Sequence, residues 1–239
     1  MTIPIRKVTA TEAIVESLKE RIRDGEFGPG DQLPSEQSML GEYGVSRLTL
    51  REALARLAAL GIIAVQHGKG AFVKSSISAE ALDNVLIPMF PQHNVNRMNE
   101  LVEARNLMES EMAAMVAAKR TPEQIDQLEK LLQFDEAALG SPEAFAERDY
   151  AFHLALAQMA GNQFLLAMYQ ALYSHIRIFL AQYALSIGDR KEALERHRPI
   201  LEAIAIKDVE TARTLAREHA RICASYIEKI RHKEKGETP

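Results

Sequence analysis

The chain has 239 residues, of which 47% are hydrophobic, and this is enough for two separate cores. A formal net charge of −4 gives no general attraction to nucleic acid, and the single cysteine, Cys223, excludes an intrachain disulfide. Because we find neither an apolar run of membrane-span length nor a signal peptide, we expect a cytoplasmic protein without a membrane partner.

The first predicted elements are three short helices. One runs from about 9 to 24. The next begins after Ser35, a good N-cap, and ends at Gly44, which tolerates the left-handed conformation of a helix C-terminus. The third begins after Ser46 and extends from about 47 to 60. Two helices joined by a tight turn are typical of a helix-turn-helix, whose second helix enters the DNA major groove.

Two short apolar strands follow, at about 62–66 and 71–73. Between them lies a Gly-rich tip in which His67, Gly68 and Lys69 are suited to a minor groove or to phosphate. A hairpin without a partner would explain the same residues, but its position after the helix-turn-helix favours a wing. The sequence therefore predicts a winged helix-turn-helix.

Four polar residues near the start of the third helix lie outside its apolar face: Ser46, Arg47, Thr49 and Arg51. Arginine can form paired hydrogen bonds with guanine, and serine or threonine can contact a base or phosphate. The alternative is that both arginines are ordinary solvated charges. Since residues 1–74 hold 10 Lys and Arg against 9 Asp and Glu, the DNA-binding interpretation depends on where the charges lie.

Residues from about 8 to 74 resemble the DNA-binding domain of the gluconate-repressor (GntR) family of bacterial transcription regulators. The matching segments are GPGDQLPSE at 28–36, VSR at 45–47, LREAL at 50–54 and GKGAFV at 68–73. The resemblance implies that double-stranded operator DNA is read by the four residues of the third helix, with His67 and Gly68 in the minor groove. Ser35, Gln37 and Lys69 complete the predicted DNA-binding set. Gln37 stands where many relatives carry a DNA-contacting arginine.

Beyond the wing, the pattern predicts a linker at 75–95 with a short helix at about 79–87, followed only by helices. The expected helices cover 96–119, 122–139, 142–160, 163–186, 190–206 and 209–232. Such a series predicts a compact bundle. The expected fold is mainly α, with a winged helix-turn-helix domain at 1–74, the linker at 75–95, and an all-α effector-binding and dimerisation domain at 96–239.

The predicted bundle contains a set of residues suited to a metal ion. Asp149 and His153 are four residues apart on one helix and share a face, while His197 and His219 belong to the last two predicted helices. A carboxylate and three imidazoles are a plausible ligand set for Zn²⁺, Ni²⁺ or a similar divalent ion. The alternative is a group of unrelated surface or core histidines.

Residues from about 96 to 232 resemble the helical effector domain, called FCD, of the fatty-acid-regulator (FadR) subgroup of the same family. The resemblance is carried by LVEAR at 101–105 with Glu109, DYAFH at 149–153, Gly161-Asn162, ERH at 195–197, and His219. It implies a divalent metal held by Asp149, His153, His197 and His219, and a small organic or sugar acid bound beside it.

Arg105 is the main candidate for binding such an acid, with an interhelical ion pair to Glu109 as the alternative. Asn162, His175 and Arg177 are further effector-binding candidates, although a surface position is an equal alternative for His175. The resemblance also implies a homodimer on a near-palindromic operator and repression relieved by the acid. Two alternatives remain, namely a metal-dependent enzyme fused to a DNA-binding head, and a regulator whose metal is purely structural.

Overall fold

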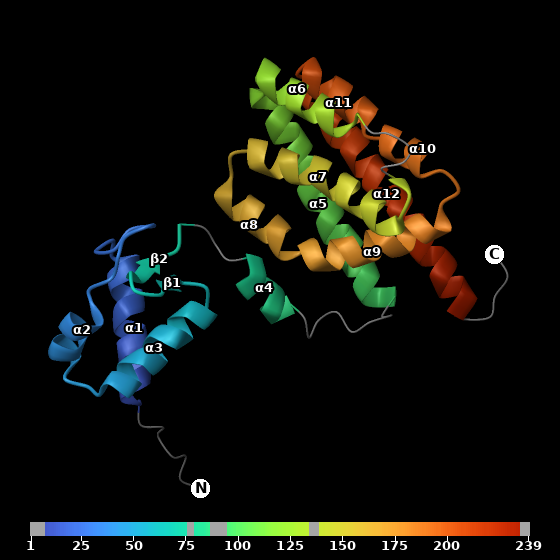
Figure 1. Ribbon diagram of the computed structural model, residues 1–239. Helices are drawn as coiled ribbons and strands as arrows, with labels where there is room; N and C mark the ends of the chain where they lie inside the picture. The colour runs from blue at the N-terminus through green and yellow to red at the C-terminus, as the bar shows by residue number, and fades with distance from the viewer. Residues whose placement is uncertain (1–7, 76–78, 87–94, 134–138, 235–239) are drawn as a thin grey trace, which may run out of the picture. The chain divides into compact units, whose positions relative to one another are not determined.

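The computed structural model describes residues 8–75, 79–86, 95–133 and 139–234, except the side chains of 79–80, 95, 223–225 and 228–234 (Figure 1). The chain divides into two compact units, Met1–Ala81 and Leu82–Pro239. Each unit has its own cluster of buried hydrophobic residues.

The first unit is a three-helix head with a two-stranded wing. Its elements are α1 (Ala10–Arg23), α2 (Glu36–Tyr43), α3 (Arg47–Ala59), β1 (Ile63–Gln66) and β2 (Gly70–Val73). The side chains of Thr9, Ser35 and Ser46 cap the three helices, each accepting a backbone N–H three residues later. Gly44 ends α2 with φ 63° in the left-handed region. The predicted winged helix-turn-helix is therefore confirmed.

The wing is fixed by a segment just before α2 as well as by its own pairing. β1 and β2 are antiparallel, and the backbone N–H of Leu33 donates to the Ala71 carbonyl at 2.8 Å, on the other edge of β2. The Gln32 side chain donates through Nε2 to the Lys69 carbonyl at 2.6 Å. The wing tip is thus attached to the body of the head, a contact that the sequence pattern did not indicate.

The first testable prediction concerns two leucines of α3. Leu50 is fully buried in the head core, so Leu50→Ala should lower the free energy of unfolding of the head by about 2–5 kcal/mol. Leu48, two residues earlier, is 78% exposed, so Leu48→Ala should change it by less than about 0.5 kcal/mol. Urea unfolding followed by circular dichroism measures both. Equal effects of the two substitutions would contradict this orientation of α3.

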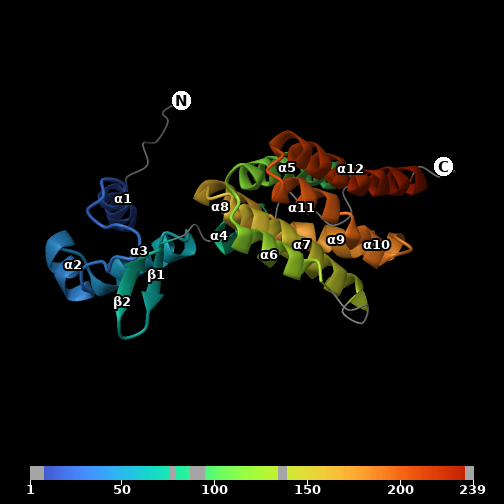
Figure 2. The same cartoon turned by 90° about the horizontal axis from the view of Figure 1, so that it is seen from above.

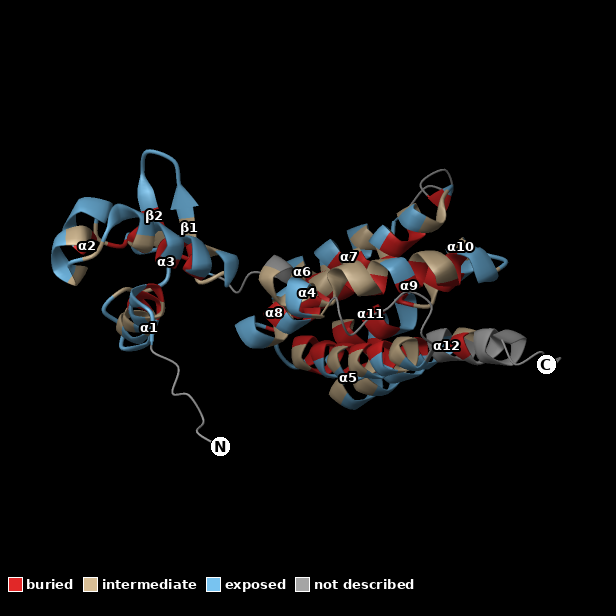
Figure 3. Ribbon diagram, turned by 90° about the horizontal axis from the view of Figure 1, so that it is seen from below, coloured by how far each residue is buried: buried red, intermediate tan, exposed pale blue. Residues whose placement is uncertain are grey.

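The second unit is a helical bundle, preceded by the short α4 (Ala79–Leu86). Its helices are α5 (Val95–Lys119), α6 (Pro122–Leu131), α7 (Pro142–Met159), α8 (Gln163–Ala171), α9 (Tyr173–Ser186), α10 (Arg190–Glu195), α11 (Arg198–Ala205) and α12 (Val209–Glu234). The long helices α5 and α12 lie side by side, as do α7 and α9 (Figures 1 and 2). The buried residues lie along the faces that these helices turn toward one another (Figure 3). The predicted all-α bundle is confirmed.

One predicted helix ends earlier, and another divides. The helix expected at 122–139 ends at Leu131, and part of its expected length, 134–138, lies outside the described residues. The helix expected at 163–186 is divided into α8 and α9, which meet at 54°.

In the described part of the chain, no single helix has the length and apolar composition of a membrane span, although α8 and α9 meet that test as a bent pair.

Packing against α7 explains the bend between α8 and α9. Tyr169, before the bend, stacks on Tyr150 of α7 with ring centroids 5.5 Å apart. Tyr173, after the bend, lies 4.5 Å from the same ring. Aromatic pairs in these geometries are favourable beyond the area they bury. The bend lets both tyrosines contact Tyr150, and no glycine or proline announces it in the sequence.

The division between α10 and α11 has a local cause. Pro199 has no N–H for a helical hydrogen bond, and its ring would clash with the carbonyl of Glu195 in a continuous helix. The chain therefore breaks, and α11 begins at Arg198 with the proline in its first turn, where it is tolerated. His197 consequently lies in the turn between two helices, and the prediction of an unbroken helix at 190–206 was wrong.

Candidate metal centre and nucleic-acid interface

The four predicted metal ligands come together in the helical unit. Asp149 and His153 lie one turn apart on α7, His197 lies in the turn before α11, and His219 lies on α12. All four are buried, and one potential ligand atom from each lies within 4.8 Å of the others. The four side chains span 70 positions of the sequence, from Asp149 to His219, so it is the fold that brings them together.

The spacing of the cluster fits a metal ion at its centre. His197 Nε2 lies 3.0 Å from His153 Nε2 and 3.4 Å from Asp149 Oδ1. Zinc bonds to histidine nitrogen and carboxylate oxygen are about 2.0–2.2 Å long, which in a tetrahedral site separates ligand atoms by about 3.3–3.6 Å, close to the spacings seen here. Two buried imidazole nitrogens at this distance need either a shared proton or a cation between them. The residues present therefore fit a divalent metal.

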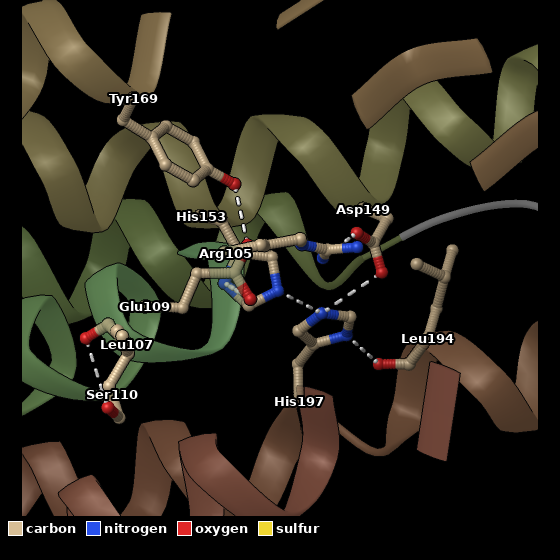
Figure 4. A network of polar contacts seen from close by, with 9 residues as sticks. All are labelled: Arg105, Leu107, Glu109, Ser110, Asp149, His153, Tyr169, Leu194 and His197. Carbon is tan, nitrogen blue, oxygen red and sulfur yellow. Dashed lines mark hydrogen bonds and ion pairs between the residues drawn. The ribbon is translucent and has the colours of Figure 1, made fainter. Parts of the chain in front are cut away.

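Outer contacts orient two of the ligands. His197 Nδ1 lies 2.8 Å from the Leu194 carbonyl, which can only accept, so Nδ1 carries the proton and the Nε2 lone pair faces the cluster (Figure 4). Arg105 Nη2 donates to Asp149 Oδ2 at 2.6 Å, which leaves Oδ1 on the side of His197. Such contacts hold ligands in place before an ion binds.

Glu109 on α5 organises the other side of the cluster. Its Oε1 accepts from Arg105 Nε at 2.5 Å and from the Tyr169 hydroxyl at 2.7 Å (Figure 4). Its Oε2 faces His153 Nδ1 at 3.5 Å. A carboxylate behind a metal-binding histidine favours a proton on the outer nitrogen and directs the other nitrogen to the metal. Arg105, Glu109 and Tyr169 thus form a support for the ligands that joins α5, α7 and α8.

The protonation of the cluster also suits a cation. Burial lowers the pKa of His153 and His219 well below the usual value, so both imidazoles are neutral near pH 7. Burial alone would raise the pKa of Asp149, but the neighbouring Arg105 charge holds it well below its usual range. Neither ring nitrogen of His219 has a hydrogen-bond partner among the described residues. The cluster combines one carboxylate with neutral nitrogen donors.

The contact between Glu109 and His153 gives the second prediction. In Glu109→Gln the carboxylate is lost, and an amide nitrogen facing His153 Nδ1 would favour a proton on Nε2, which then cannot bind metal. We expect Zn²⁺ affinity to fall about 10–100-fold, as measured by competition with a chromophoric chelator. The matched control is Glu111→Gln on the same helix, since Glu111 is half-exposed and pairs with Arg213 instead. Unchanged affinity in Glu109→Gln would remove this residue from the support.

Only one of the four effector-binding candidates contacts the cluster through an interaction seen in the structure. Arg105 is buried and pairs with Glu109 and Asp149. The alternative predicted for it, an ion pair with Glu109, is present, but it joins two residues of one helix and not two helices. From the sequence, Glu109 is predicted as that partner and as part of the family resemblance, without a role behind a metal ligand, and Tyr169 is not among the predicted residues.

The other three effector-binding candidates have different surroundings. Asn162 is exposed, and its Oδ1 caps α8 by accepting from two backbone N–H groups at 3.1 Å. His175 Nε2 lies 3.3 Å from Asp83 of α4. Arg177, half-exposed, pairs loosely with Glu147 at 3.8 Å. Asn162 thus serves as a helix cap and Arg177 as an ion-pair partner, and an effector role for all three residues stays a prediction.

The predicted DNA-binding residues are on the surface of the head. Thr49 is half-buried, and the others are exposed: Ser35, Gln37, Ser46, Arg47, Arg51, His67, Gly68 and Lys69. Ser46 Oγ lies 2.8 Å from Thr49 Oγ1, which holds both hydroxyls at the start of α3. Arg51 pairs with Glu36 of α2 at 3.1 Å. The start of α3 thus presents hydroxyl and guanidinium groups together.

Known proteins match both units. Residues 10–73 match the family described as "Bacterial regulatory proteins, gntR family", and residues 100–221 match the FCD domain. The "HTH-type transcriptional repressor NanR" of Escherichia coli strain K12 is 31% identical over 215 residues, which cover 82% of this chain and 80% of that protein. The chain belongs to the GntR family of bacterial regulatory proteins.

Two further comparisons agree with this membership. NanR of Escherichia coli O1:K1 / APEC is 34% identical over 172 residues, covering 71% of the regulator and 65% of that protein. The solved structure of Streptococcus agalactiae GntR has a TM-score of 0.67 and 28% identity over 90% of the regulator and 99% of that chain. Both NanR relatives are transcriptional repressors, so the prediction of a transcription regulator is confirmed and the enzyme alternative is wrong.

Proposed function

We propose that the regulator represses transcription as a homodimer on operator DNA and is released by a small carboxylate or sugar acid bound at a metal in its helical unit. The main support for a bound metal is that four buried side chains come together: Asp149, His153, His197 and His219. The Escherichia coli relative NanR is a transcriptional repressor, which supports repression. We place it in the FadR subgroup, and in the cytoplasm because bacterial operators lie there.

The proposed metal is Zn²⁺ or Ni²⁺, since imidazole nitrogen with one carboxylate suits both ions. Asp149 would bind it through Oδ1, and His153 and His197 through Nε2, the atoms that face one another. When bound, the ion supplies positive charge and attracts a carboxylate oxygen of the effector. Burial keeps water away from the ligands and lowers the pKa of His153 and His219, so that these two imidazoles are neutral.

The proposed DNA contacts follow from the surface of the head. The start of α3 would lie in the major groove, where Arg47 and Arg51 pair with guanine and the hydroxyls of Ser46 and Thr49 contact bases or phosphate. The wing residues His67 and Lys69 would contact the minor groove or the backbone. Two subunits would place two copies of α3 in successive major grooves.

Release requires that the acid prefer one arrangement of the regulator over another. A ligand shifts such an equilibrium only by its difference in affinity for the two states, and operator DNA must then weaken acid binding by the same factor. The support formed by Arg105, Glu109 and Tyr169 connects the metal ligands to neighbouring helices. Because Arg105 contacts Asp149, and Glu109 contacts both Arg105 and Tyr169, a change at Asp149 would alter contacts on α5 and α8.

A panel of small organic and sugar acids tests the proposal. Zinc-loaded full-length protein is titrated with each acid while thermal unfolding is followed, because a ligand that binds only the folded state raises the midpoint. We expect one acid to raise the midpoint and to release operator DNA, and His219→Ala to abolish both effects. A metal-loaded protein that responds to no acid would instead support a purely structural metal.

A further inference from the structure

A leucine occupies the outer surface of the helix proposed to read DNA. Leu48 lies in the first turn of α3 between Arg47 and Thr49, and it is 78% exposed. Single exposed hydrophobic residues are common and need no explanation by themselves. The position of this one, however, is set by the core side chains of the same helix.

The direction of Leu48 follows from the helical repeat. The residues of α3 that face the head core are Leu50, Ala53, Leu54 and Leu57. At about 100° per residue, the Leu48 side chain points roughly opposite to the mean direction of these four. Around the helix axis, the Arg51 side chain lies about 60° from that of Leu48 on the same outer surface. Arg47 and Thr49 lie about 100° to either side of Leu48. Leu48 is therefore the side chain of the first turn that projects furthest from the core.

Chemistry limits what such a side chain can contact in a major groove. Leucine has no hydrogen-bonding group, so it offers nothing to a phosphate or to the polar edges of guanine, cytosine and adenine. The C5 methyl of thymine is the apolar group in the groove that an aliphatic side chain can cover. We propose that Leu48 selects a thymine in each operator half-site, next to guanine read by Arg51, an inference that rests on the proposed placement of α3.

Removal of single methyl groups from DNA tests this inference. An operator is first selected from random duplexes by the full-length protein, and each thymine is then replaced in turn by deoxyuridine, which lacks only the C5 methyl. We expect one replacement per half-site to weaken binding about fourfold, from the burial of one methyl-sized group. Replacement of the remaining thymines should leave affinity unchanged.

The variant Leu48→Ala should bind the thymine and deoxyuridine operators equally at that position. The matched control, Leu60→Ala, removes another exposed leucine just beyond the other end of α3 and should retain the wild-type fourfold difference. The inference is overturned if no thymine matters, if the half-site contains none, or if Leu48→Ala keeps the difference. Failure to select any operator would instead overturn the proposed DNA-binding function.

Discussion

His197→Ala is expected to lose high-affinity binding of Zn²⁺. His197 Nε2 is 3.0 Å from the nearest nitrogen of His153 and 3.4 Å from an oxygen of Asp149, so its removal leaves the remaining ligands without a central partner. Loss of an outer contact to a metal ligand typically costs about 10–100-fold in affinity, and loss of the ligand itself should cost more. Competition titration with a chelator measures the change directly.

The same variant separates metal binding from folding. At a free Zn²⁺ concentration 1,000 times the dissociation constant, the ion should stabilise the wild-type protein by about 4 kcal/mol, and this gain should vanish in His197→Ala. His67→Ala removes an exposed histidine of the wing and should keep the full gain. Helical circular dichroism without metal confirms that the bundle still forms. Wild-type zinc affinity in His197→Ala would refute the assignment of this residue as a ligand.

Local signals in the sequence were sufficient for the head. Ser35 and Ser46 are side-chain caps, and Gly44 supplies the left-handed residue that ends α2, so neighbouring residues alone determine these boundaries. The bundle helices were also predictable from periodicity and from caps such as Thr121. The break before α11 also has a local signal, because Pro199 cannot continue a helix, whereas the apolar periodicity alone predicts one helix at 190–206.

The metal ligands could be predicted from the sequence, but the contacts behind them could not. Asp149 and His153 share a helix face by spacing, and His197 and His219 joined them as histidines of the last two predicted helices, a set that the family resemblance then supported. Tyr169 contacts Glu109 across 60 positions of the chain, and no local pattern specifies that contact. The bend between α8 and α9 has the same origin, because it depends on packing between helices. Tertiary contacts therefore determine what the sequence pattern left open.

A shared buried arginine explains why this support should act as a unit. Arg105 is 2% exposed and pairs with both Glu109 and Asp149. A buried charge is costly unless it is paired, so removing one carboxylate leaves the arginine more dependent on the other. Burial raises the pKa of Glu109, while the Arg105 charge opposes that change. The ligand Asp149 and the support are consequently coupled through one guanidinium.

Arg51→Ala is expected to weaken binding to the operator much more than binding to unrelated DNA. The Arg51 side chain is 65% exposed on α3, and Glu36 holds its Nε at 3.1 Å. This pairing directs a planar guanidinium whose terminal nitrogens can form two hydrogen bonds with one guanine. Loss of such a contact costs about 1–3 kcal/mol, so operator affinity should fall about 5–150-fold in a gel-shift titration at fixed salt.

Arg56→Ala provides the matched control, because it removes the same charge from an exposed position in the last turn of the same helix. It should change affinity for operator and unrelated DNA by similar small factors, since a general phosphate attraction carries no sequence information. Arg51→Lys adds a stricter comparison. This variant keeps the positive charge but loses the paired guanidinium donors that match guanine. It should therefore bind unrelated DNA with wild-type affinity but prefer the operator much less than the wild type does. If Arg51→Ala and Arg56→Ala had equal effects on operator selectivity, α3 would not present Arg51 to the bases.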